Sequence, residues 1–318
     1  MEAAGRIRGF MPSVRDGAEL WSAYRQRCRT GGPGGTSPVV TLGSSRFMLG
    51  IDPAVLSTTI GRPVISLAID ASSPIPVLRD LAMDEHFNGI VLCEIGAFLK
   101  KGTPQWQQWT EKPEQYLRYF ASRTAMSDIE ALLAATLQSH FVFLLPELNP
   151  RTLFADVLSR QLDLRPAYLR MRPDRYRPAD YERVDRPRQL KHWIDVFGDL
   201  GPPLTAEDLM SFVAETNGFV SRIQRRGGEV VFLRMVSSDG VRTVEDQHSP
   251  RWQWDLFAQK TEGIAIHYED VPTLRFFRAA EGSHLDYRSV DAFSRALGGE
   301  LIQRGAVKWD PHRERGRR

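Results

Sequence analysis

Five short apolar runs, each bounded by glycine, proline or polar residues, constrain the fold of this chain more than any other feature. They span residues 38–43, 63–70, 89–96, 229–236 and 263–270. Continuous apolar runs of four to eight residues are typical of strands that are buried on both faces of a sheet. Helical segments separate the runs, and strand–helix–strand connections are right-handed and leave the strands parallel. The pattern therefore predicts a three-layer α/β/α fold with about five parallel strands.

The order of the runs predicts a single domain with additions. Residues 39–310 form the α/β/α domain, with a large helical insertion at about 100–225 after the third strand. Both flanks of this insertion belong to the sheet, so we do not expect it to be a separate domain. Residues 1–38 predict a short amphipathic helix at about 17–28 followed by a flexible Gly/Pro linker. Residues 311–318 form a basic tail.

Capping residues mark several of the expected helices. One helix is expected over 75–85, and a closing helix over 289–305. Apolar residues at i, i+3 and i+4 spacing predict helix through 114–145, with Ser127-Asp128 as a cap where it restarts. Thr205 has the position of an N-cap before a further helix with acidic residues in its first turn.

The charge of the chain is nearly balanced, with 42 Lys and Arg against 39 Asp and Glu. Arginine is concentrated in residues 165–190, where acidic residues and prolines interrupt it. We interpret this stretch as a solvated, Pro-broken segment, because a nucleic-acid site needs a more continuous basic stripe with stacking aromatics. We therefore expect no nucleic-acid partner.

Neither a membrane span nor a metal site is indicated. No run reaches 18 apolar residues, and the N-terminus lacks the apolar core of a secretory signal. We expect a cytoplasmic protein, the alternative being an extracytoplasmic domain whose N-terminal anchor lies outside this sequence. Cys28 and Cys93 show no CxxC spacing and no histidines at metal-ligand intervals. We expect no metal and no organic cofactor, and we place Cys93 in the core.

Three polar stretches fall at the carboxyl edge of the predicted sheet, where α/β folds keep their sites. Ser45 follows the first strand, residues 69–74 follow the second, and residues 279–289 come before the last helix. A nucleophilic serine needs a base, a group that holds the base, and donors for the oxyanion. His284 supplies a base, and Glu281, three residues earlier, supplies a carboxylate that can orient it.

Backbone N–H groups near the expected helix starts, at Ser45 and at Ala71 and Ser72, supply the oxyanion donors. A plainer alternative is a strand-to-helix turn in which Ser44 or Ser45 only caps the helix. Another is a phosphate or nucleotide site, since such a turn before a helix also forms an anion nest. That last alternative gives no role to the histidine.

Charged residues beside these stretches complete the set of candidate substrate-binding residues. Arg46 either holds an anionic group of a substrate or pairs with Asp52 or Asp70. Glu94 and Arg234, near the ends of the third and fourth strands, face the same cleft. We expect a buried ion pair between these two.

Three short blocks resemble the SGNH (GDSL-type) hydrolases and the related bacterial acyltransferases that modify cell-surface polysaccharides. "VVTLGSSR" places Ser45 where the family has its nucleophile, and "LAIDASSP" places Ala71 or Ser72 where a small residue gives an oxyanion N–H. "EGSHL" places His284 where the family has its base. The segments "LGSSR", "GIDP" and "SHLD" are close to those of a mostly membrane-anchored subgroup. The resemblance implies a flavodoxin-like sheet between the first and last blocks.

The sequence departs from the family at two points. The family's acid is aspartate, whereas Glu281 stands here, three residues before the histidine. The family's Gly-x-Asn-Asp block has no counterpart, because the third strand ends in "CEIGAF", so the side-chain oxyanion donor is missing. Loss of one such donor typically lowers the rate by about 10²–10³.

Two expectations for function follow, from different classes. The first is a serine-dependent ester hydrolase or O-acyltransferase that forms an acyl-enzyme on Ser45 and acts on a carbohydrate or another acylated metabolite. The alternative is a catalytically inactive SGNH-like scaffold that binds a glycan or a partner protein. Hydrolysis and transfer differ only in what reaches the acyl-enzyme, and the sequence leaves this choice and the oligomeric state open.

Overall fold

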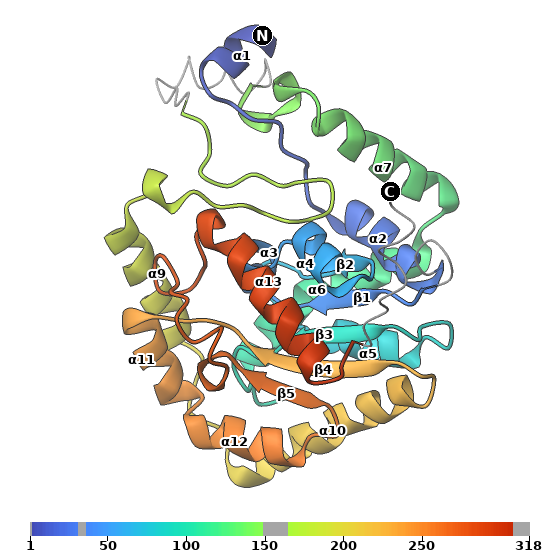
Figure 1. Cartoon of the computed structure of the whole chain (residues 1–318), viewed down its shortest axis with the longest axis vertical. Coiled ribbons are helices and arrows are strands. Elements are labelled where there is room, and N and C mark those ends of the chain that lie inside the picture. The colour runs from blue at the N-terminus through green and yellow to red at the C-terminus, as the bar shows by residue number, and fades with distance from the viewer. Residues whose placement is uncertain (1, 31–35, 149–164, 308–318) are drawn as a thin grey trace.

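The computed structural model describes residues 2–30, 36–148 and 165–307. At its centre lies a five-stranded, all-parallel sheet in the order β2-β1-β3-β4-β5 (Figure 1). The strands are β1 (Val39–Leu42), β2 (Val64–Ser66), β3 (Ile90–Glu94), β4 (Glu229–Arg234) and β5 (Ile264–His267). This is the strand order of flavodoxin-like sheets. The predicted three-layer α/β/α fold with about five parallel strands is confirmed.

Alternate side chains of the strands point to opposite faces of the sheet and divide the core into two clusters. Along β1, Val39 packs in one cluster, and Val40 and Leu42 pack in the other. Every residue of β1 and of β3 is buried. Because both faces are covered, these strands read as continuous apolar runs rather than as an alternation of apolar and polar residues.

Helices form the two outer layers. One face of the sheet is covered by α3 (Ser45–Gly50), α4 (Pro53–Ile60) and α13 (Tyr287–Gln303), which crosses in front of the strands in Figure 1. The other face is covered by α2 (Ala18–Thr30), α5 (Ile75–Met83), α6 (Pro104–Ser122), α10 (Ala206–Gln224) and α12 (Arg251–Lys260). The side chains of Trp21 and Arg25 in α2 are fully buried. The expected N-terminal helix is therefore part of the packed fold.

The first part of the insertion differs from the sequence prediction. Helix α6 begins at Pro104, and α7 (Ala125–Gln138) starts after Thr124, which is its N-cap. Ser127, expected as the cap, is the third residue of the helix and bonds back to Thr124 N at 3.0 Å. Thr124 and Ser127 form a capping box. Ser127 is therefore the third residue of the helix and not the residue before its start. Thr205 does cap α10, accepting a hydrogen bond from Asp208 N at 3.1 Å.

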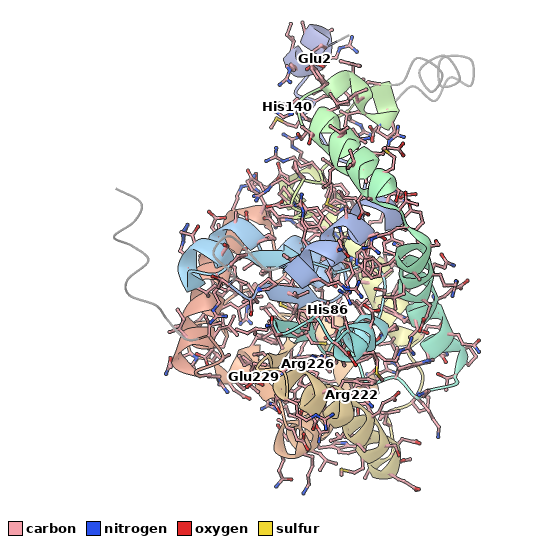
Figure 2. The ribbon with its side chains drawn as sticks, turned by 90° about the vertical axis from the view of Figure 1, so that its right-hand side faces the viewer. Glu2, His86, His140, Arg222, Arg226 and Glu229 are labelled. Atoms are coloured by element: carbon pink, nitrogen blue, oxygen red, sulfur yellow. The ribbon has the colours of Figure 1, made fainter. Side chains whose placement is uncertain are left out.

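The short helix α1 (Glu2–Ile7) projects away from the sheet and contacts the end of the first half of the insertion. It packs against η1 (Val142–Leu144), which is followed by η2 (Pro146–Leu148). Glu2 accepts a hydrogen bond from Phe143 N at 3.1 Å, and Arg6 donates to His140 O at 2.6 Å. Figure 2 shows Glu2 and His140 at the tip of this projection.

The arginine-rich segment is not solvated throughout, contrary to our expectation. Arg175 is fully buried and donates to the carbonyls of Ser66 and Ala68, at 2.8 and 2.9 Å. Its charge is balanced by Asp16 at 2.7 Å. The arginine satisfies backbone carbonyls at the end of β2 that would otherwise be buried without a donor. The segment therefore packs over the sheet edge before η3 (Tyr181–Arg183) and α9 (Arg186–Gly198) begin.

The remaining elements close the carboxyl-terminal half. Helix α11 (Asp239–His248) follows β4 and packs beside α9 at one end of the sheet, and η4 (Tyr268–Asp270) follows β5 (Figure 1).

Cys93 is buried in the core, as predicted. Most of the expected Gly/Pro linker and the whole basic tail lie outside the described residues. No helix within the described part of the chain is both long enough and apolar enough to cross a bilayer.

The close approach of α4 and α13 at Gly298 provides a test of this packing. A Cβ atom at Gly298 would lie 2.6 Å from Thr59 Cγ2, whereas one at Gly299 would meet nothing within 4 Å. We expect Gly298→Ala to lower the free energy of unfolding by about 1–3 kcal/mol, because overpacking outweighs the gain in helix propensity. Gly299→Ala should raise it by up to about 1 kcal/mol. Urea denaturation of both variants measures the difference, and equal effects would contradict the packing.

Candidate active site

Ser45 lies in the first turn of α3, directly beyond the carboxyl end of β1. The chain leaves β1 to form β2 on one side and returns to form β3 on the other. The carboxyl ends of β1 and β3 therefore flank the topological switch point, where open α/β sheets bind their ligands. Ser45 is 9% exposed, so its hydroxyl faces a restricted space rather than open solvent.

His284 brings its imidazole ring to Ser45 although 239 positions separate the two residues in the sequence. Its Nε2 atom lies 2.8 Å from Ser45 Oγ. Glu281 Oε1 contacts Nδ1 of the same ring, and Glu281 Oε2 accepts a hydrogen bond from His284 N at 2.9 Å. A carboxylate at Nδ1 selects the tautomer in which Nε2 can accept the serine proton. The structure thus brings together the three residues that the sequence predicted as nucleophile, base and orienting acid.

The environment of Glu281 keeps this carboxylate ionised. Burial alone would raise the pKa of Glu281, but the hydrogen bonds and charge of His284 outweigh it and leave the pKa below its usual value. Tyr181 stacks on the His284 ring, with 6.4 Å between centroids. Burial and the nearby Glu281 carboxylate raise the pKa of Tyr181, so its phenol stays protonated. Trp193 contacts the same imidazole edge-on at 4.9 Å.

The loop that carries Glu281 and His284 depends on Gly282. This residue has φ +91°, in the region that favours glycine. A Cβ atom here would lie 2.6 Å from Val241 Cγ2 and 2.8 Å from Leu190 Cδ1. Any side chain at this position would push the loop away from α9 and α11. Glu281 and His284, which lie on this loop, would then move with it.

Ser44 is engaged elsewhere, as the N-cap of α3. Its Oγ accepts a hydrogen bond from Arg46 N at 3.3 Å and donates to Glu94 Oε2 at 2.9 Å. Its backbone N–H donates to the same carboxylate oxygen at 2.6 Å. The capping interpretation is therefore confirmed for Ser44, while the neighbouring hydroxyl of Ser45 is directed to His284.

Arg46 is buried and pairs with a carboxylate that the sequence analysis did not consider. Its Nη2 lies 2.5 Å from Glu245 Oε1, and its Nε donates to Ser283 Oγ at 3.2 Å. The guanidinium also lies over the ring of Phe197, 4.7 Å from the centroid. These contacts connect α3 to α11 and to the residue that precedes His284.

The two carboxylates expected as partners of Arg46 are held by the arginine-rich segment instead. Asp52 pairs with Arg172 at 2.6 Å, and Asp70 pairs with Arg177 at 2.8 Å. The expectation of a local pair for Arg46 was wrong because these more exposed arginines reach the two carboxylates from outside the sheet edge.

The expected ion pair between Glu94 and Arg234 is also wrong. Arg234 Nη2 lies 3.1 Å from Glu245 Oε2, so Glu245 is held between Arg234 and Arg46. Burial alone would raise the pKa of Glu245, but the two guanidinium groups outweigh it and lower the pKa. Glu94 accepts hydrogen bonds from Ser44 instead. Arg234, the last residue of β4, turns toward α11, the next helix in the chain.

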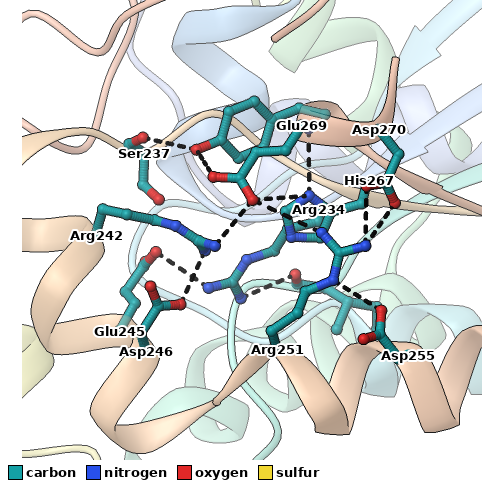
Figure 3. Close-up of polar contacts among 12 residues, drawn as sticks. Arg234, Ser237, Arg242, Glu245, Asp246, Arg251, Asp255, His267, Glu269 and Asp270 are labelled. Carbon is teal, nitrogen blue, oxygen red and sulfur yellow. Dashed lines mark hydrogen bonds and ion pairs between the residues drawn. The ribbon is translucent and has the colours of Figure 1, made fainter.

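Figure 3 shows a further layer of charges around Arg234. Arg242 pairs with Glu269 at 3.0 Å, and Arg251 pairs with Asp270 at 2.7 Å. Burial, together with the surrounding arginines, lowers the pKa of His267 to about 2, so this ring is neutral and accepts a hydrogen bond from Glu269 N. The cluster ties α11 and α12 to the end of β5. Arg234 therefore belongs to a structural network and does not line the cavity beside Ser45.

Backbone N–H groups around Ser45 remain without an acceptor. Those of Ser45, Ala71 and Ser72 donate to no residue that the structure describes. Ala71 has φ +52°, a conformation that costs a non-glycine residue about 1 kcal/mol or more. The hydroxyl of Ser72 donates to Ile69 O at 2.7 Å. The expected oxyanion donors are thus unengaged, and all three residues line the same cavity.

This cavity has a volume of about 370 Å³ and opens directly beside Ser45. Its polar end is formed by residues at or just beyond the carboxyl ends of β1, β2 and β3, among them Ser44, Arg46 and Glu94. Its remaining walls are apolar and come mostly from the insertion: Leu99, Trp106, Trp109, Trp193, Val196, Phe197 and Phe212. We call it the aromatic cavity. A larger cavity of about 650 Å³ contains none of Ser45, Glu281 and His284 and adjoins the aromatic cavity at Asp70.

The sequence analysis missed the aromatic walls and Tyr181. Trp106 and Trp109 are three residues apart on α6, and Trp193 and Phe197 are four apart on α9. Such spacing places each pair on one face of its helix. The same spacing also marks a face packed in the core, so the pattern alone does not distinguish a cavity wall from core.

Comparison of the sequence with models of known protein families finds no match, and comparison with curated proteins finds no significant similarity. Among the residues that the structure describes, no group of three His, Cys, Asp or Glu side chains could hold a metal ion.

The lowered pKa of Glu281 predicts a specific loss of stability in acid. A carboxylate whose pKa is lower in the folded than in the unfolded state stabilises the fold above the unfolded value, near 4.5, and this contribution is lost as the pH falls through the folded value. Glu281→Gln should flatten the dependence of the free energy of unfolding on pH below 4.5, by up to about 1.4 kcal/mol per pH unit.

The matched control for this measurement is Glu130→Gln, on the exposed surface of α7. Urea denaturation between pH 3 and pH 6 gives the slopes of all three proteins. A Glu281→Gln slope equal to that of the unaltered protein would show that the carboxylate does not have the lowered pKa.

Proposed function

We propose that the protein is a serine esterase or O-acyltransferase that works through an acyl-enzyme on Ser45. The observation that carries the proposal is the 2.8 Å contact between Ser45 Oγ and His284 Nε2, with Glu281 on the other ring nitrogen. As part of the same proposal we place the chain among the SGNH hydrolases, on the basis of its motifs and the flavodoxin-like strand order.

In the first step, Ser45 Oγ attacks the carbonyl carbon of an ester while its proton passes to His284 Nε2. The C–O bond to the alcohol then breaks, and the imidazolium returns the proton to the departing alkoxide. The acyl group remains on Ser45. In the second step, water or an acceptor hydroxyl gives its proton to His284 and attacks the acyl carbon. The bond between this carbon and Ser45 Oγ then breaks, and the imidazolium returns the proton to Oγ, so that a carboxylic acid or a new ester leaves and the serine is restored.

Two features of the site support stabilisation of the tetrahedral intermediate. The unengaged N–H groups of Ser45 and of Ala71 or Ser72 border the space in front of the hydroxyl. Glu281 stabilises the imidazolium that forms on His284. The chain at the end of β3 reads Glu94-Ile95-Gly96 and provides no asparagine there. We therefore expect turnover about 10²–10³ slower than in an enzyme that has this third donor.

The identity of the nucleophile can be tested by covalent labelling. The unaltered protein should react with a fluorophosphonate probe, and Ser45→Ala and His284→Ala should not. Ser44→Ala, the matched control, should retain labelling because Ser44 Oγ bonds Glu94 and not the base. Gel fluorescence and mass spectrometry of the labelled peptide give the readout. Labelling that persists in Ser45→Ala would refute the assignment, and absence of labelling in the unaltered protein would favour the binding scaffold.

The orienting role of Glu281 predicts a graded loss of activity. Glu281→Gln should lower kcat by roughly 10³–10⁴, because an amide no longer selects the productive tautomer. Glu281→Asp keeps the charge but is one methylene shorter, and we expect a smaller loss, roughly 10–100-fold. The two rates are measured on p-nitrophenyl acetate, with thermal unfolding as a check on folding. Equal kcat for Glu281→Gln and the unaltered protein would exclude an orienting role.

A further inference from the structure

The aromatic cavity has two chemically different ends. Polar side chains line the end near Ser45, and His192 and Gln108, which are exposed, line the rim. Between them the walls consist of aromatic and aliphatic side chains from α6, α9 and α10 and from the segment after β3. A group attached to the reacting carbonyl at Ser45 would extend directly into this apolar part.

The polar side chains at the inner end are already bonded within the protein. Ser44 donates to Glu94, Ser72 donates to Ile69 O, and Arg46 is paired with Glu245. A sugar ring placed here would lose hydrogen bonds to water and would find few side-chain partners, which weakens its binding. An apolar occupant loses nothing of this kind and gains the burial of its surface.

The size of the cavity also exceeds what an acetyl group needs. A volume of about 370 Å³ falls in the range of small-molecule sites. It is about ten times the roughly 30 Å³ that one water molecule occupies in the liquid. A methyl group is of similar size to a water molecule, so an acetyl group would leave most of the cavity empty.

We propose that the aromatic cavity holds the acyl chain of the substrate and that the preferred substrates are esters of medium-chain fatty acids, with about eight carbons. This assignment rests on the proposed function. The acyl group stays on Ser45 through both steps, whereas the alcohol must leave and an acceptor must enter between them. A largely apolar space beside Ser45 suits the group that stays.

The first test measures kcat/KM for p-nitrophenyl esters from acetate to decanoate. The value should rise about fourfold for each added methylene until the cavity is full, giving at least 100-fold between acetate and octanoate. Cleavage that is independent of acyl length would overturn the inference while leaving the proposed function intact. A dependence on the alcohol in a series of alkyl acetates, with none on the acyl chain, would overturn it as well.

A matched pair of variants tests the location. Val196→Phe adds a ring to the wall of the cavity, whereas Val55→Phe makes the same change at a half-buried position of α4 that does not line it. Val196→Phe should lower the ratio of octanoate to acetate activity at least tenfold, and Val55→Phe should leave the ratio unchanged. An unchanged ratio in Val196→Phe, with the protein folded, would place the chain elsewhere.

A binding measurement separates failure of the inference from failure of the proposed function. Ser45→Ala should bind octanamide at least 100-fold more tightly than acetamide in calorimetry, and the ratio should fall in Val196→Phe. Octanamide binding together with no ester cleavage or labelling by the unaltered protein would refute the proposed function and with it the substrate assignment. Equal affinity for the two amides would refute the apolar chain site itself.

Discussion

A parallel sheet buried on both faces is the constraint on which the rest of this structure depends. Every strand runs in the same direction, so after each strand the chain crosses one face of the sheet before the next strand begins. All carboxyl ends therefore lie at one edge of the sheet. Ser45 and Glu94 come together there because β1 and β3 are neighbours. His284 reaches the edge by another route, from the loop before α13. Its distance from Ser45 therefore depends on how α13 packs against α3 and α4.

Buried charges hold these separate segments in register. Arg46, Glu245 and Arg234 come from α3, α11 and β4, and all three side chains are almost fully buried. Removal of one partner from such a group leaves a buried charge without compensation and typically costs about 3–5 kcal/mol. Through Ser283, Arg46 also reaches the loop of the base. Helix α3 and the loop that carries His284 are thus joined by a second contact besides the one between Ser45 and His284.

The sheet and the Ser45–His284–Glu281 arrangement were predictable because both follow from local patterns combined with the parallel-strand rule. Glu281 and His284 are close in sequence. Ser45 follows β1, so it must lie at the carboxyl edge of the parallel sheet. The partners of Arg46 and Arg234 were not predictable. The tertiary structure decides which of several carboxylates a long side chain reaches. Glu245 lies in α11, which comes after Arg46 and Arg234 in the sequence. Arg175 shows the same limit, because its partners are backbone carbonyls that no sequence pattern marks.

The Ser45–His284–Glu281 group and the apolar walls of the aromatic cavity come from different parts of the fold, yet they meet at α9. Segments at the carboxyl edge of the sheet supply Ser45, His284 and the free amides, whereas the insertion supplies most of the apolar walls. Trp193 of α9 lines the cavity and touches the His284 ring, and Phe197, one turn later, lies under Arg46. An occupant packed against the rings of Trp193 and Phe197 would also restrain the His284 ring and the Arg46 guanidinium, which these two rings contact. Under the proposed assignment, binding energy from the acyl chain would therefore be used to orient His284, and chain length would act on kcat as well as on KM.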